Sequence, residues 1–182
     1  DHLVSEAFYF TDPEGNGIEL YLDRPRETWQ WKDGRVAMDT IFLDPNAYLG
    51  DHLSMDRLRR AAQDPAVVGH VHLQVGDTTT AKQFYVDTLG FETTLEMPSA
   101  LFVSAGGYHH HMAMNTWNSA GAGPRVPALG LGVVDIVLPE DDDLGALKDR
   151  LRTRGLQFAD DGRTLEVEDP WRNRVRVTVE GR

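Results

Sequence analysis

The chain has 182 residues, and none of them is a cysteine. A protein without thiols can form neither a disulfide framework nor a thiolate metal site. Disulfides mark proteins of oxidising compartments, so their absence fits the cytoplasm, which is the location that we expect.

Long apolar runs and an excess of positive charge are also missing. No apolar stretch approaches the roughly 18 residues of a membrane-spanning helix, and the first residues lack the basic and apolar segments of a signal peptide. The formal net charge is −11, whereas a nucleic-acid-binding surface needs clustered lysine and arginine. We therefore expect neither a membrane nor a nucleic acid as a partner.

Two stretches of the sequence repeat each other without a gap. Residues 7–20 read AFYFTDPEGNGIEL, and residues 164–177 read TLEVEDPWRNRVRV. Each copy has an alternating apolar pattern on both sides of an Asp-Pro pair, which predicts two strands joined by a turn. The alignment places Glu19 of the first copy and Arg176 of the second at the same position of this hairpin.

The second hairpin follows a complete module, whereas the first has no strands before it in the sequence. A hairpin alone is only marginally stable in water. We therefore expect that upstream partner strands of the first hairpin are missing from this chain. A hairpin without them would favour association with another chain by strand addition, so a homo-oligomer is one expected state.

The remaining pattern of apolar residues and turn formers predicts one arrangement of elements twice. The first set is a strand over 68–75, a helix over about 77–89, and strands over 91–97, 100–104 and 109–115. The second set is a strand over 129–138, a helix over 141–154, and strands over 156–159, 164–168 and 174–179. The order βαβββ in both sets predicts an α+β fold of paired modules. The predicted domains are 1–22, the terminal hairpin of a truncated domain; 23–67, a linker with a short helix over about 54–62; and 68–182, a complete domain of two modules.

Several segments together resemble the vicinal oxygen chelate superfamily, which includes glyoxalase I, bleomycin-resistance proteins and extradiol ring-cleavage dioxygenases. They are the opening strand GHVHLQVGD, the helix AKQFYVDTLGF and the DPxxN turn. The first hairpin is the most specific part, since its residues have the spacing of the extradiol dioxygenase signature. Those residues are His2, Phe8, Tyr9, Asp12, Pro13, Gly15 and Glu19. The whole layout, with the segment GGYHHHMAMNTW, is similar to dioxygenases of the catechol-2,3-dioxygenase type.

The resemblance implies a ferrous ion held by two histidines and one carboxylate, which leaves coordination positions open for a catechol and for O₂. Mn(II) shares this ligand set. The resemblance assigns the carboxylate to Glu19 and gives catalytic roles to His2, as an acid or base, and to Tyr9, as a hydrogen-bond donor to the catecholate. The two histidine ligands would lie on strands before residue 1, so this chain would not assemble that site alone.

Each of these three residues also has an ordinary structural interpretation. An acid on an exposed strand, such as Glu19, is most often a surface residue, and a tyrosine in a hairpin, such as Tyr9, most often packs against its neighbours. His2 stands at a chain end, where fraying is expected. The complete signature favours the functional interpretation for Glu19 most strongly of the three.

The second domain keeps only part of the ligand pattern that the resemblance requires. His70 stands at the position of the first metal histidine, at the start of an opening strand. The matching position of the next module is Val133, and the carboxylate position is Arg176, a cation that would repel a metal ion. We therefore expect the second domain to lack a complete metal site and His70 to be a structural histidine.

His109, His110 and His111 form a run that could bind metal or could line a cleft as part of a polar strand. Adjacent residues on a strand alternate between its two faces, so at most two of the three histidines would point into one cavity. His70 together with His110 or His111 could make a partial site, which makes His111 a candidate ligand beside His70.

Three functions remain open. The first is an Fe(II)-dependent extradiol dioxygenase in the catabolism of catechol-like aromatics, with this chain as its C-terminal part and inactive by itself. The second is a non-catalytic module of the bleomycin-resistance type, which binds a small molecule without a metal. The third is a glyoxalase-type lyase, which would not need His2 and Tyr9. The signature favours the first for the complete protein, and Val133 and Arg176 favour the second for the domain that is present.

Overall fold

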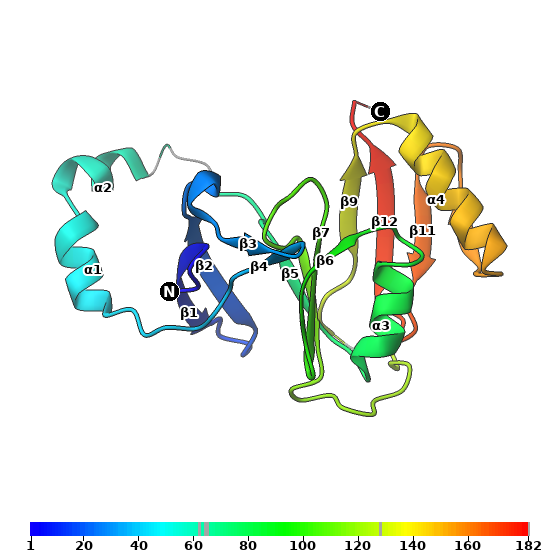
Figure 1. The fold of residues 1–182 in the computed structure, drawn as a ribbon, viewed down its shortest axis with the longest axis horizontal. Coiled ribbons are helices and arrows are strands. Elements are labelled where there is room, and N and C mark those ends of the chain that lie inside the picture. Colours follow the sequence, from blue (N-terminus) through cyan, green and yellow to red (C-terminus); the bar gives the residue numbers. More distant parts are fainter. Residues whose placement is uncertain (62, 64–65, 128, 182) are drawn as a thin grey trace. The chain divides into compact units, whose positions relative to one another are not determined.

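A computed structural model describes residues 1–61, 63, 66–127 and 129–181 of the chain (Figure 1). The chain forms two compact units, Asp1–Gly69 and His70–Arg182. Among the described residues, no helix is both long and apolar enough to cross a membrane.

The first unit contains the hairpin that the alternating pattern of residues 7–20 predicts. β1 (Ser5–Thr11) and β2 (Gly17–Asp23) pair antiparallel in a register that puts Tyr9 opposite Glu19. A 3-10 helix, η1 (Arg26–Thr28), and a short hairpin of β3 (Trp31–Lys32) and β4 (Arg35–Val36) follow. Two helices, α1 (Pro45–His52) and α2 (Met55–Ala61), complete the unit.

Helix α1 lies in the segment for which the sequence predicts only a linker. Asp44 caps this helix through Oδ1, which accepts hydrogen bonds from the backbone N–H groups of Asn46 (2.9 Å) and Ala47 (3.2 Å). None of its residues is buried, so α1 lacks the apolar stripe by which amphipathic helices are found in a sequence. Helix α2 matches the helix predicted over about 54–62, whose last residue, Ala62, lies outside the described residues.

The second unit contains two βαβββ modules, which confirms the predicted fold class. The first module comprises β5 (Val71–Gln74), α3 (Thr78–Tyr85), β6 (Glu92–Met97), β7 (Ala100–Ser104) and β8 (Met112–Asn115). The second comprises β9 (Val134–Leu138), α4 (Asp141–Thr153), β10 (Phe158–Asp160), β11 (Leu165–Glu168) and β12 (Arg174–Val179). In each module the first strand lies parallel to the last, and the last three strands form an antiparallel meander. The strand orders are therefore β5-β8-β7-β6 and β9-β12-β11-β10.

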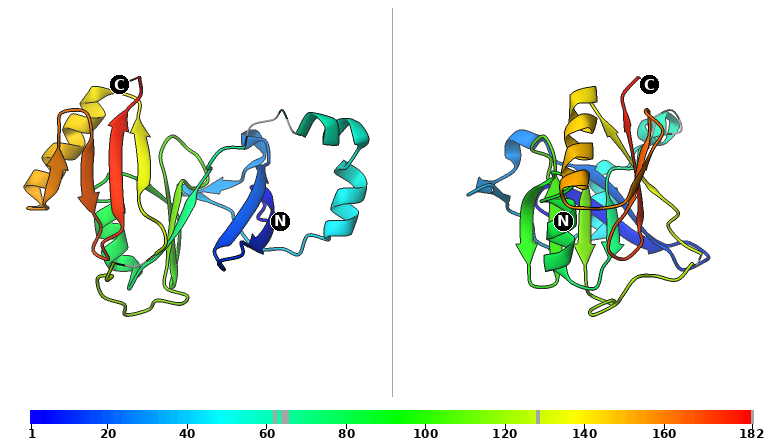
Figure 2. Two further views of the ribbon diagram at one scale, coloured as in Figure 1. Left: turned by 180° about the vertical axis from the view of Figure 1, so that it is seen from behind. Right: turned by 90° about the vertical axis from the view of Figure 1, so that its right-hand side faces the viewer.

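One apolar core joins the two modules of this unit. Figure 2 shows α4 lying along one face of the sheet that contains β12, and its buried residues repeat at the three- and four-residue spacing of one helix face. The residues that the helices contribute to this core are Ala81, Phe84 and Tyr85 from α3 and Leu144, Leu147 and Leu151 from α4. A buried polar bond also links the modules, because the Tyr85 hydroxyl donates to Asp169 Oδ2 at 2.8 Å.

Four strands begin at least two residues later than the sequence pattern predicts, among them β5 at Val71 rather than at 68 and β10 at Phe158 rather than at 156. β8 begins at Met112 rather than at 109, and β9 begins at Val134 rather than at 129. Glycines explain both differences, because Gly106 and Gly107 have left-handed φ angles (64° and 67°) that turn the chain before β8. Before β9, Gly130 has a positive φ of 149°. The histidine run 109–111 therefore lies in a loop and not on a strand.

Candidate functional site

The turn of the first hairpin is held by one aspartate. Asp12 Oδ1 accepts hydrogen bonds from the backbone N–H groups of Glu14 (2.9 Å) and Asn16 (2.8 Å), and Oδ2 accepts one from the Asn16 side-chain amide (2.8 Å). These bonds, with that of the Asn16 side chain first, hold the pKa of the Asp12 carboxyl below its ordinary value. Gly15 has a left-handed φ of 83°, which glycine adopts without steric cost.

The turn of the second hairpin repeats these bonds around a buried aspartate. Asp169 Oδ1 accepts from the backbone N–H groups of Trp171 (2.9 Å) and Asn173 (2.8 Å), and Oδ2 accepts from the Asn173 side-chain amide (2.8 Å). Arg172 takes the left-handed φ, 64°, at the position of Gly15. The two turns therefore have the same structure, although only one contains the favourable glycine.

The strand register shows which side chains of the two hairpins are equivalent. Tyr9 pairs with Glu19 in the first hairpin, and Glu166 pairs with Arg176 in the second. The members of each pair stand at the same distances in sequence before and after the turn aspartate. Positions 19 and 176 are therefore the same place in two copies of one structure, acidic in the first and basic in the second.

The three candidate residues of the first unit form one hydrogen-bonded chain. The Tyr9 hydroxyl donates to Glu19 Oε1 at 2.6 Å, and the same hydroxyl lies 2.6 Å from His2 Nε2. His2 Nδ1 lies 2.8 Å from the carbonyl oxygen of Asp39. The structure thus brings together all three residues that the sequence singles out in this hairpin.

The partners of His2 constrain one of its ring nitrogens. A carbonyl oxygen only accepts, so the contact of His2 Nδ1 with Asp39 suits a proton on Nδ1. The Tyr9 hydroxyl donates to Glu19 and also contacts His2 Nε2, which stands 3.8 Å from Glu19 Oε1. Such a chain can pass a proton between histidine and carboxylate through the phenol.

Tyr9 keeps its own proton at physiological pH. Partial burial of the hydroxyl, followed by the hydrogen bond and charge of Glu19, raises the pKa of Tyr9 well above its ordinary value. The ring itself is largely exposed, so the hydroxyl is the restricted end of the side chain. Tyr9 is therefore a neutral hydrogen-bond donor and acceptor in this position.

The first unit supplies one member of the metal-ligand set that the resemblance implies. Glu19 is the residue to which the resemblance assigns the carboxylate of that set, and within the described part of Asp1–Gly69 no group of three metal-binding side chains lies together. The residues of this unit taken alone therefore do not complete a site for Fe(II).

The equivalent place in the second unit is occupied by paired charges. Arg176 Nε donates to Glu166 Oε1 at 2.8 Å, and its Nη1 donates to Asp135 Oδ1 at 3.4 Å. The hydrogen bond with Glu166, followed by the charge of Asp135, raises the pKa of the Arg176 guanidinium. Val133, the position of the second metal histidine, is a partly buried aliphatic residue just before β9.

The structure brings three histidines of the second unit together. One ring nitrogen from each of His70, His109 and His110 lies within 4.8 Å of the others. The predicted ligand His111 instead places its Nδ1 3.1 Å from the Ser104 hydroxyl. His109 is the member that sequence reasoning left out, because the alternation expected of a strand does not apply to the loop in which it lies.

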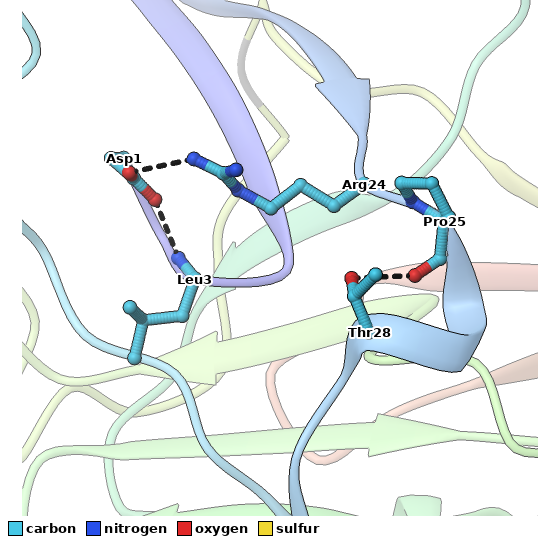
Figure 3. A pocket seen from close by; sticks show the side chains of 5 residues that line it. All are labelled: Asp1, Leu3, Arg24, Pro25 and Thr28. Atoms are coloured by element: carbon cyan, nitrogen blue, oxygen red, sulfur yellow. Dashed lines mark hydrogen bonds and ion pairs between the residues drawn. The ribbon is translucent and has the colours of Figure 1, made fainter.

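The first unit also has a shallow hollow of about 390 Å³ near its N-terminal residues, lined by Asp1, Leu3, Arg24, Pro25 and Thr28. Figure 3 shows the Arg24 guanidinium turned to the Asp1 carboxylate, at 2.8 Å, and the Thr28 hydroxyl turned to the Pro25 carbonyl, at 2.7 Å. These polar groups bind one another, and the lining includes none of the predicted site residues.

Known proteins resemble the chain in sequence and in fold. A family model described as the Glyoxalase/Bleomycin resistance protein/Dioxygenase superfamily matches residues 67–177. The chain is 41% identical over 174 residues to the catechol-2,3-dioxygenase of Bacillus subtilis (strain 168). The aligned region covers 93% of this chain but only 60% of the length of that protein. A solved glyoxylase/bleomycin resistance protein/dioxygenase domain from Frankia sp. EAN1pec is 17% identical, with a TM-score of 0.51 over 64% of this chain and 98% of that one. This last likeness bears on the fold alone.

Proposed function

The chain belongs to the Glyoxalase/Bleomycin resistance protein/Dioxygenase superfamily, and on that premise we propose that the complete gene product is an extradiol dioxygenase that cleaves the ring of catechol-like aromatics. In this proposal Glu19 is the carboxylate metal ligand, and His2 and Tyr9 are the catalytic proton-transfer groups. The observation that carries it is the hydrogen-bonded chain from His2 through Tyr9 to Glu19. The 41% identity to a catechol-2,3-dioxygenase supports the same reaction class.

The proposed division of labour follows from the chemistry of the residues. Fe(II), bound by Glu19 and two histidines from outside the first hairpin, would supply open coordination positions for the aromatic diol and for O₂. Tyr9 stays neutral and can direct its hydroxyl to an oxygen of the bound diol. His2 Nε2 lies within hydrogen-bond distance of the Tyr9 hydroxyl, so His2 can give a proton to this hydrogen-bonded chain and take one back.

The proposal also includes the metal, the cellular location and the association state. The metal is Fe(II), with Mn(II) compatible with the same ligands, and the enzyme works in the cytoplasm, where it could associate as a homo-oligomer. The chain of 182 residues alone should not convert catechol to a coloured ring-opened product after anaerobic reconstitution with Fe(II), because its first unit lacks the two histidine ligands. Activity in this chain alone would contradict that expectation.

The proposal is tested by substitutions in the complete gene product. Glu19→Gln should lose bound iron and lower kcat/KM for catechol by more than about 100-fold, since even the partners of metal ligands contribute 10–100-fold. Tyr9→Phe should retain iron but lower kcat by about 100-fold, the size of one proton-transfer contribution. Glu14→Gln, an exposed acid of the same hairpin, is the matched control and should behave as the wild type. Iron and activity retained in Glu19→Gln would reject the proposal.

A second function is favoured for the unit His70–Arg182 by the ion-paired Arg176. We infer that this unit retains the fold without the family's ligand set and binds a small molecule non-catalytically, as bleomycin-resistance proteins do. The pairs of Arg176 with Glu166 and Asp135 support this, because the cation at the carboxylate position is held in place. Calorimetric titration of Glu19→Gln with catechol should then still show binding without turnover. If this variant does not bind catechol, only the proposed dioxygenase function remains.

A further inference from the structure

We infer that His70, His109 and His110 form a binding site for a divalent transition-metal ion, of which Zn²⁺ suits them best. The site lies wholly within the unit His70–Arg182. In this unit the three ligand positions of the family pattern hold His70, Val133 and Arg176. The proposed site shares only His70 with that pattern.

The sheet topology brings His70 to the β7–β8 loop, although the two are distant in the sequence. His70 directly precedes β5, which pairs in parallel with β8 so that Val71 lies opposite Met112. The loop of residues 105–111 ends where β8 begins, and it comes alongside His70 for that reason. The Val71 N–H donates to the His111 carbonyl at 3.2 Å and holds this junction together.

His109 and His110 can act on the same ion because they lie in a loop. Neighbouring residues of a strand point to opposite faces, but these two precede the start of β8 at Met112. Their Nδ1 atoms are 2.7 Å apart, and the ring centroids of His110 and His70 are 4.2 Å apart. The loop backbone is fixed by Thr94, whose hydroxyl donates to the His109 carbonyl at 2.6 Å.

Two of the three histidines are shielded from solvent. His109 is completely buried, and His110 is 7% exposed. Aromatic rings flank both, with Tyr108 at 4.1 Å from His109 and Phe102 at 5.1 Å from His110 between ring centroids. These packed surroundings limit the movement of both imidazole rings.

The distances suit a tetrahedral ion. Zinc–nitrogen bonds of about 2.0–2.1 Å place the ligand nitrogens roughly 3.3 Å from one another. The three candidate ligand nitrogens all lie within 4.8 Å of one another, so shifts of about 1.5 Å or less would close the site. Imidazole nitrogens suit zinc, copper and nickel, and three of them leave a fourth position for water or another ligand.

The test uses the 182-residue chain with Zn²⁺ or Co²⁺ alone. Calorimetry should give one Zn²⁺ per chain, and Co²⁺ should produce the visible absorption bands of a tetrahedral complex. His70→Gln and His110→Gln should each weaken Zn²⁺ binding by more than about 10-fold. Zn²⁺ should raise the thermal midpoint of the wild type and have a smaller effect on either variant.

Matched controls separate this site from others. His52→Gln changes a histidine on α1 that stacks on Tyr48, and Glu14→Gln changes an exposed acid of the first hairpin. Both variants should bind Zn²⁺ as the wild type does. Because His70 precedes β5 and is only partly buried, His70→Gln remains a valid test even where His110→Gln fails to fold. No Zn²⁺ binding, or Zn²⁺ binding that His70→Gln leaves unchanged, would overturn the inference.

Discussion

The two hairpins of this protein have the same turn and register but different surroundings. In the second, apolar residues face α4 and the core, and Val175 and Val177 are 0% and 1% exposed. Their counterparts in the first hairpin, Ile18 and Leu20, are 40% and 58% exposed. The sequence pattern is the same in both, so the turn is a local property, whereas burial depends on which elements pack on the strands.

The difference extends to the functional position. Glu19 joins a proton-carrying chain with Tyr9 and His2, whereas Arg176 closes the equivalent place with ion pairs to two acids. In the proposed function, the hairpin therefore forms part of a site in one copy, whereas in the other copy it supports the core. Substitutions at matched positions should separate these two roles.

The largest difference is expected at the turn aspartates. Asp169→Ala should lower the free energy of unfolding by about 4 kcal/mol, because it leaves buried donors, including the Tyr85 hydroxyl, without their acceptor. Asp12→Ala should cost much less, since water can replace the carboxylate at this solvent-accessible turn. Urea unfolding followed by circular dichroism measures both values. Equal losses would mean that the two turns are supported alike.

The next effect concerns the apolar faces of the hairpins. Leu165→Ala should destabilise the protein by about 3 kcal/mol, because this residue is completely buried against the core. The same substitution at the exposed Leu20 should cost less than about 1 kcal/mol. Hydrogen exchange of the β12 amides should report the first loss and remain unchanged for the second. A large effect of Leu20→Ala would show that the face of the first hairpin is covered in solution.

A smaller effect is expected on the pH dependence of the free energy of unfolding, through the buried hydrogen bond between Tyr85 and Asp169. Burial, followed by the charge of Asp169, raises the pKa of Tyr85 well above its ordinary value. Above about pH 10 the unfolded state therefore holds fewer protons than the folded state, so stability falls as the pH rises. In Tyr85→Phe this fall should be shallower by up to about 1.4 kcal/mol per pH unit. Parallel curves for the two proteins would show that Tyr85 ionises without unfolding.

The smallest effects are expected at the left-handed turn positions. Gly15→Ala should destabilise the first hairpin by about 1 kcal/mol, because its φ of 83° disfavours a side chain. Arg172→Gly should stabilise the second by up to about 1 kcal/mol, since it relieves the same strain at φ 64°. Thermal unfolding measures both shifts, and shifts of the same sign would contradict the equivalence of the turns.

Local patterns predicted most of the fold. The Asp-Pro turns, the alternating strands and the apolar spacing of α4 each reflect a short-range rule, and the structure confirms the order βαβββ in both modules. Helix α1 escaped prediction because it buries nothing, and the starts of β8 and β9 were placed too early because glycine turns interrupt apolar segments. Where a chain forms a loop rather than a strand depends on backbone angles that composition alone does not specify.

The two candidate sites also differ in how far local sequence patterns predict them. The family signature singled out His2, Tyr9 and Glu19 as candidates, and the register of one hairpin places Tyr9 opposite Glu19, but the hydrogen bond to His2 was not predicted. The cluster of His109 and His110 with His70 could not be predicted in full. It depends on the pairing of β5 with β8 and on the loop before β8, both of which are products of tertiary structure.

The most direct test of the central claim is the iron content of two variants of the complete gene product, Glu19→Arg and Arg176→Ala. Both substitutions change the equivalent position, one in each copy of the hairpin. Metal analysis after anaerobic reconstitution should find iron lost from Glu19→Arg and retained at the wild-type level in Arg176→Ala. Iron retained in the first variant, or lost from the second, would contradict the assignment of the metal-binding role to Glu19.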